Sequence, residues 1–89
     1  MSVNYSKDDY YKKEYERIVN RFIWNASIFS PVDSSYDCCY REAVEEIEKL
    51  YQRAKKRRDM TSYLRIWALQ AVKRHYTYNK RLLNKIVVR

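Results

Sequence analysis

The chain has 89 residues, of which 46% are hydrophobic, and it carries a formal net charge of +8. A chain of this length has material for one hydrophobic core, so we expect a single domain over residues 1–89. The sequence contains no glycine and one proline. Because hairpin turns and phosphate-cradling loops commonly use glycine, this composition favours an all-α fold and disfavours hairpin-rich and P-loop proteins.

The first predicted helix spans about residues 7–24, after an approximate capping box formed by Ser6 and Asp9. Its apolar positions recur every three or four residues, and they are Tyr11, Tyr15, Ile18, Val19, Phe22 and Ile23. This spacing predicts an amphipathic helix with one face in the core. Residues 26–35 hold Pro31, the only proline, among turn-forming residues, and they predict the first loop.

The second predicted helix spans about residues 36–57 and begins near Ser35 or Asp37. Its apolar side comprises Tyr40, Ala43, Val44, Ile47, Leu50, Tyr51 and Ala54. Glutamates occupy the first half and Lys and Arg the second half, which is the order that a helix dipole favours. A well-capped helix end is therefore sufficient by itself to explain the basic run.

The third predicted helix spans about residues 61–87, with Asp59 or Thr61 as its N-cap. One apolar stripe comprises Met60, Leu64, Trp67, Ala71, Tyr78, Leu82 and Ile86, and a second comprises Leu69, Tyr76, Leu83 and Val87. A helix with two apolar stripes contacts two neighbours, so we expect a small three-helix bundle with a long C-terminal helix. Because this helix is longer than the other two, its C-terminal end could pair with a second copy of the chain, and a homodimer is an alternative.

Charge is distributed unevenly along the chain. Residues 1–48 hold six Lys and Arg against ten Asp and Glu, and residues 49–89 hold thirteen against one. The cations of the second half are the candidate phosphate contacts of a nucleic-acid-binding protein, and they are Arg53, Lys55, Lys56, Arg57, Arg58, Arg65, Lys73, Arg74, Lys80, Arg81 and Lys85. Each phosphate that they neutralise releases counterions, so the predicted binding to DNA or RNA has little sequence specificity. A solvated basic face is the simpler interpretation of the same residues.

Two more specific forms of nucleic-acid recognition stay open. The second and third helices have the outline of a helix-turn-helix, in which Thr61, Ser62 and Arg65 would face base edges, although the turn lacks glycine. Tyr10, Tyr63 and Tyr76 are candidates for exposed rings that stack on bases. Trp67, by contrast, is predicted to be a core residue.

The competing hypothesis is a protein–protein interaction module, such as an adaptor, an inhibitor or a self-assembling subunit. Its contacts would be the second stripe of the third helix, Leu69, Tyr76, Leu83 and Val87, together with the basic face. Aromatic side chains are enriched at such interfaces, so the tyrosines suit this hypothesis equally well.

Catalytic, metal and cofactor sites are not predicted. The adjacent Cys38 and Cys39 lack the spacing of zinc ligands, and His75 is the single histidine. We therefore expect a binding protein and not an enzyme. No apolar run is long enough to span a membrane and no signal peptide is evident, so we expect an intracellular protein, cytoplasmic or nuclear. A small, tyrosine-rich chain without glycine is more typical of viruses and mobile elements than of housekeeping enzymes.

Overall fold

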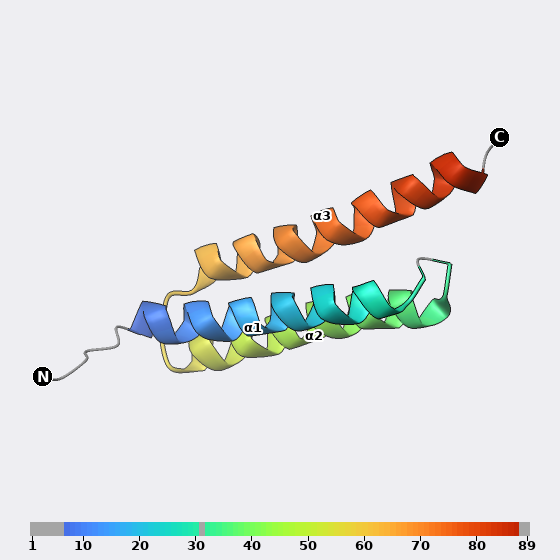
Figure 1. Cartoon of the computed structure of the whole chain (residues 1–89). Helices are drawn as coiled ribbons and strands as arrows, with labels where there is room; N and C mark the ends of the chain where they lie inside the picture. The colour runs from blue at the N-terminus through green and yellow to red at the C-terminus, as the bar shows by residue number, and fades with distance from the viewer. Residues whose placement is uncertain (1–6, 31, 88–89) are drawn as a thin grey trace, which may run out of the picture.

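The computed structural model describes residues 7–30 and 32–87, and side-chain environments for residues 9–30 and 32–82. This part of the chain forms three helices, α1 (Lys7–Ile28), α2 (Ser34–Lys56) and α3 (Ser62–Val87). Successive helices run in opposite directions, and α3 diverges from the other two toward its C-terminal end (Figure 1). Each helix contacts the other two, which confirms the predicted three-helix bundle with a long C-terminal helix.

Helix α1 extends to Ile28, beyond the predicted end near Trp24. Its buried positions are Tyr11, Tyr15, Val19, Phe22 and Ala26, at spacings of three and four residues. Ala26 continues the buried stripe, and no helix-breaking residue comes before Pro31, so packing carries the helix further. The loop to α2 is consequently shorter than the predicted 26–35.

Helix α2 begins at Ser34, earlier than predicted, because Asp33 is its N-cap. The Asp33 carboxylate accepts a hydrogen bond of 3.0 Å from the backbone N–H of Ser35. This start places Tyr36, which the sequence did not mark as a core residue, fully in the interior. Ala43, Ile47, Leu50 and Ala54 are buried as predicted, whereas Tyr40, Val44 and Tyr51 are half-buried.

The core face of α3 lies between the two predicted stripes. Leu64, Ala68 and Val72 are buried there, and Thr61, just before the helix, is also buried. Among the first-stripe residues whose side chains the structure describes, only Leu64 is buried, so the expectation that Trp67 belongs to the core is wrong. Small side chains at 68 and 72 let α3 approach its neighbours closely, which turns the larger first-stripe residues outward.

An aromatic cluster fills the end of the bundle where α3 diverges. Tyr76 stacks on Tyr40 and Tyr36, with ring centroids 4.1 and 5.4 Å apart, and the His75 ring meets Phe22 edge-on at 5.6 Å. The Tyr76 hydroxyl donates to the Asp37 carboxylate at 2.6 Å. Tyr76 is therefore a packing residue that joins α3 to α2, and the prediction that its ring is free to stack on bases is wrong.

Two tyrosines of α1 fix the opposite end of the bundle. The Tyr11 hydroxyl donates a 2.6 Å hydrogen bond to Asp59 in the α2–α3 turn. The hydroxyls of Tyr15 and Thr61 lie 3.3 Å apart in the interior and share a hydrogen bond. These contacts hold the α2–α3 turn against α1, and they position the basic residues that precede the turn.

Candidate nucleic-acid interface

Five cations gather where α2 ends. We call them the basic end, and they are Arg53, Lys55, Lys56, Arg57 and Arg58. All five are exposed, and none of them forms a salt bridge within the described part of the chain. Five unpaired positive charges on about one and a half helical turns make a local concentration of charge that attracts anions.

The backbone at this end has a specific geometry. The N–H of Asp59 donates to the carbonyl of Ala54 at 2.9 Å, and the N–H of Arg58 donates to the carbonyl of Lys55 at 3.0 Å. This pair of hydrogen bonds is a Schellman motif, in which the residue after the cap adopts a left-handed conformation. Arg58 occupies that position with a φ of 61°, where glycine is the usual residue. The chain thus places an arginine where glycine would be less strained.

Two of the predicted phosphate contacts are paired with carboxylates of α2 in partly exposed salt bridges. Arg65 binds Glu48 through two nitrogens, at 2.7 and 2.9 Å, and its guanidinium lies 4.8 Å from the centre of the Tyr51 ring. The hydrogen-bonded carboxylate raises the pKa of Arg65. Lys80 lies 3.1 Å from Asp37 and above the Tyr76 ring. Both cations join helices, so they contribute little free charge to the surface.

The remaining cations of α3 differ in their surroundings. Lys73, Arg74 and Arg81 are exposed, and no salt bridge joins them to another described residue. Arg74 and Arg81 are seven residues apart and therefore lie on one side of α3. The side chain of Lys85 lies outside the described residues. Eight of the eleven predicted contacts are thus exposed and unpaired.

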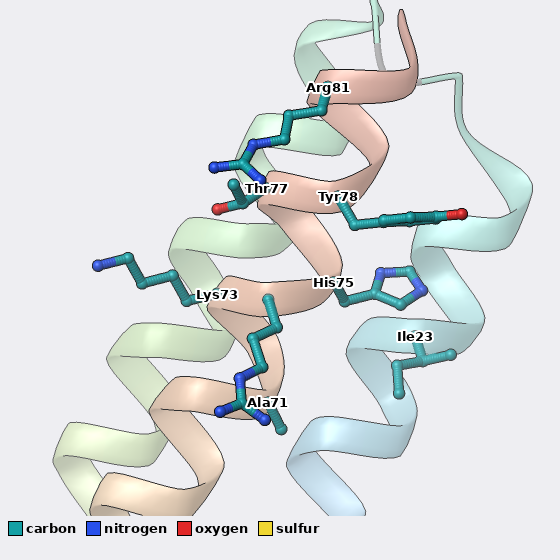
Figure 2. A pocket seen from close by; sticks show the side chains of 8 residues that line it. Ile23, Ala71, Lys73, His75, Thr77, Tyr78 and Arg81 are labelled. Atoms are coloured by element: carbon teal, nitrogen blue, oxygen red, sulfur yellow. The ribbon is translucent and has the colours of Figure 1, made fainter.

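A groove runs between α1 and the outer side of α3. We call it the α1–α3 groove; its volume is about 730 Å³, and its apolar lining includes Ile23, Ala71 and Tyr78. Figure 2 shows the His75 and Tyr78 rings projecting from α3 toward Ile23 of α1, while Lys73 and Arg81 project from the other side of α3. The sequence signal for this groove was the first apolar stripe, which we had assigned to the core.

The predicted interface stripe of α3 is partly used within the chain. Leu69 and Tyr76 are half-buried and pack against the core, and the side chains of Leu83 and Val87 lie outside the described residues. Tyr10 and Tyr63 are exposed, at 51% and 56%, and the Tyr10 ring meets the Tyr11 ring edge-on at 5.1 Å. Trp24 and Trp67 are exposed as well, at 68% and 44%, whereas Trp67 had been predicted to be a core residue.

The helix-turn-helix interpretation does not agree with the side-chain positions. Thr61 is 1% exposed and shares a hydrogen bond with Tyr15, so its hydroxyl cannot reach a base edge. Arg65 is held by Glu48. In addition, α2 and α3 run as antiparallel neighbours (Figure 1), whereas a helix-turn-helix crosses at a steep angle.

The cysteines and the histidine lie in ordinary environments. Cys38 is exposed, Cys39 is half-buried, and burial raises the pKa of the Cys39 thiol. His75 shares a 3.2 Å hydrogen bond with the Asn79 amide. Among the described residues, no three His, Cys, Asp or Glu side chains are placed to hold a metal ion. Helices long and apolar enough to span a bilayer are also absent from the part of the chain that was searched.

Comparison of the chain with protein-family models, with curated proteins and with solved structures finds no match in any of the three.

Proposed function

We propose that this protein binds nucleic acid through phosphate contacts, with little sequence specificity. The observation that carries the proposal is the basic end, where five adjacent cations are exposed and free of salt bridges. Lys73, Arg74 and Arg81 extend the same charge along α3. Each phosphate that these cations neutralise releases condensed counterions, which provides affinity without base readout.

The glutamates at the start of α2 lie far from the basic end, whereas Asp59 directly follows it and accepts the Tyr11 hydroxyl at 2.6 Å. Helix α2 runs from acid to base, so Glu42 lies about 21 Å along the helix from Lys56, at 1.5 Å per residue. This separation exceeds the Debye length of about 8 Å at physiological ionic strength. A phosphate at the basic end would therefore experience the cations with little repulsion from this glutamate.

The expected lack of sequence specificity follows from the type of contact. Base readout needs side chains held in a defined geometry, often a guanidinium that donates two parallel hydrogen bonds. The exposed cations of the basic end have no described partner that fixes their direction. Such flexible side chains follow the phosphates of many sequences equally well.

The test replaces Lys55, Lys56, Arg57 and Arg58 with Gln and measures binding of labelled duplex DNA, single-stranded DNA and RNA over a range of salt. We expect an unchanged helical circular dichroism spectrum, uniformly weaker binding, and a log–log salt slope for duplex DNA reduced by up to about 3.6, or 0.9 for each lost contact.

The control replaces Arg17, Arg21 and Arg41 with Gln, which removes three charges from exposed positions of the acidic half, and its effect is compared per charge removed. Its effect on affinity should be much smaller. An equal loss per charge in both variants would show that only net charge matters. A loss limited to one sequence would contradict phosphate-only contact, and no binding by the wild-type protein at low salt would refute the proposal.

A protein–protein interaction module is the second candidate function. A separate observation favours it, because large apolar side chains are exposed around the α1–α3 groove. Contiguous exposed apolar surface of this kind marks sites of interaction with other molecules.

A further inference from the structure

The α1–α3 groove has the chemistry of a docking site for a helix. Ile23 from α1 and Ala71 and Tyr78 from α3 form an apolar lining, with the His75 ring between them (Figure 2). Ile23 is 39% exposed and Tyr78 is 63% exposed, so the lining is open to solvent. Open apolar grooves between helices commonly accept the apolar face of another helix.

The exposed apolar surface continues along α3 beyond the groove. Trp67 and Leu82 are 44% and 40% exposed, and both lie within about 60° of Ala71 around the helix. From Trp67 to Leu82 the stripe is about 22 Å long, which corresponds to about four helical turns. A stripe of this length matches a partner helix rather than a single side chain or a small molecule.

The charged border of the groove selects the partner's chemistry. Arg74 lines the groove, Lys73 and Arg81 lie at its outer border on the side of α3 away from Ile23 (Figure 2), and none of the described lining residues is acidic. A partner that buries an apolar face here needs carboxylates beside that face, since charge complementarity sets partner choice at a rim. A symmetric pairing of two copies through the groove would instead bring two sets of these cations together, which costs energy.

We propose that the α1–α3 groove binds an acidic amphipathic helix of a partner protein, whose apolar face covers Ile23 and Tyr78 while its carboxylates pair with Arg74 and Arg81. This interaction is independent of the basic end, and it does not depend on nucleic-acid binding. It assigns a role to the exposed apolar stripe of α3, which phosphate contacts leave unexplained.

The experiment uses the full chain and a labelled helical peptide of about 18 residues, with leucines at i, i+3, i+4 and i+7 and glutamates on both flanks. Two further peptides serve as probes: one keeps the leucine face with lysine flanks, and one keeps the composition with scrambled leucines. We expect fluorescence anisotropy to show binding of the glutamate-flanked peptide and none of the other two.

Charge reversal tests the rim directly. The variant R74E/R81E should weaken binding of the glutamate-flanked peptide by about tenfold or more and should create binding of the lysine-flanked peptide. The variant I23A/Y78A should also lose binding, with an intact circular dichroism spectrum, because both side chains are exposed. Its control is Y10A/Y63A, which truncates two exposed rings that do not line the groove and should bind normally.

Several outcomes would overturn the proposal. Peptide affinity that is the same in wild type, R74E/R81E and I23A/Y78A would do so. Self-association in sedimentation that disappears in I23A/Y78A would identify a second copy as the occupant, and loss of single-stranded DNA binding alone in I23A/Y78A would identify nucleic acid. The Gln variant of the basic end should keep full peptide affinity, so failure of the proposed nucleic-acid function is distinguishable from failure of this one.

Discussion

Arg58 is the position where stability and proposed binding oppose each other most directly. Its backbone is left-handed, with a φ of 61°, and it completes the Schellman motif at the end of α2. A left-handed conformation costs an L-residue about 1–2 kcal/mol. Glycine avoids this cost, although its greater freedom in the unfolded chain offsets about 0.5–1 kcal/mol of the gain.

We therefore expect Arg58→Gly to stabilise the protein by about 0.5–1 kcal/mol. For a domain of this size, this corresponds to a rise in Tm of roughly 2–8 °C. Thermal and guanidinium unfolding followed by circular dichroism measures the change. The same variant removes one exposed cation, so the salt slope of nucleic-acid binding should fall by about one.

Two neighbouring variants separate the causes. Arg57→Gly removes an identical charge, but Arg57 has a φ of −86°, so glycine there should destabilise by about 0.5–1 kcal/mol. Arg58→Gln removes the charge and keeps the left-handed cost, so its stability should equal that of the wild type. An Arg58→Gly variant no more stable than the wild type, or an Arg57→Gly variant stabilised as much, would refute a left-handed cost at Arg58.

Two further predictions concern the polar contacts between helices. The hydrogen bond to Asp37 raises the pKa of Tyr76 from its usual 10.0 to about 12, so its contribution to stability is complete below pH 10 and lost as the pH rises toward 12. Urea unfolding across this range should show a shallower alkaline loss for Tyr76→Phe, and identical alkaline slopes would count against the assignment. Arg65→Gln should lower the unfolding free energy by about 1 kcal/mol or less, because it leaves Glu48 unpaired. The same change should leave the salt slope of nucleic-acid binding unaltered, and a slope reduced by about one would return Arg65 to the phosphate-binding set.

The sequence predicted the helices better than their ends. Glycine-free composition and helical spacing were sufficient for three helices in the right places. The start of α2 was less certain because Asp33, Ser34, Ser35 and Asp37 are all acceptable near a helix N-terminus. The start at Ser34, with Asp33 as N-cap, buries Tyr36 against the other helices. Contacts between helices cannot be predicted from the residues near one helix end.

The outward turn of Trp67 has a similar physical origin. A pattern of large apolar residues predicts the core face of α3 along the first stripe. In the structure the buried face instead contains the small Ala68 and Val72, which permit close packing of the helices. Hydrophobicity along one helix cannot indicate how near its neighbours approach. The exposed stripe, and with it the α1–α3 groove, therefore became visible only with all three helices in place.

Which cations form salt bridges could not be predicted from the spacing of residues along one helix either. Arg65 pairs with a glutamate 17 residues away, and Lys80 pairs with Asp37 on another helix. At 100° per residue, these two cations lie about 100–180° around α3 from Arg74 and Arg81. The acids of α2 neutralise the first pair and leave the second pair exposed, so a uniform basic stripe in sequence becomes two distinct surfaces.

The exposed cations of α3 are the point where the two proposals meet. Arg74 and Arg81 cannot neutralise phosphates and partner carboxylates at the same time. Arg74 lies about 18 Å along α3 from Ser62, the first helical residue after the α2–α3 turn, and this axial separation exceeds the Debye length of about 8 Å at physiological salt. A helix bound in the α1–α3 groove would therefore withdraw the α3 cations from a nucleic acid while the basic end kept its contacts. It would shorten the nucleic-acid site without abolishing it, which is the behaviour expected of an adaptor with two adjoining surfaces.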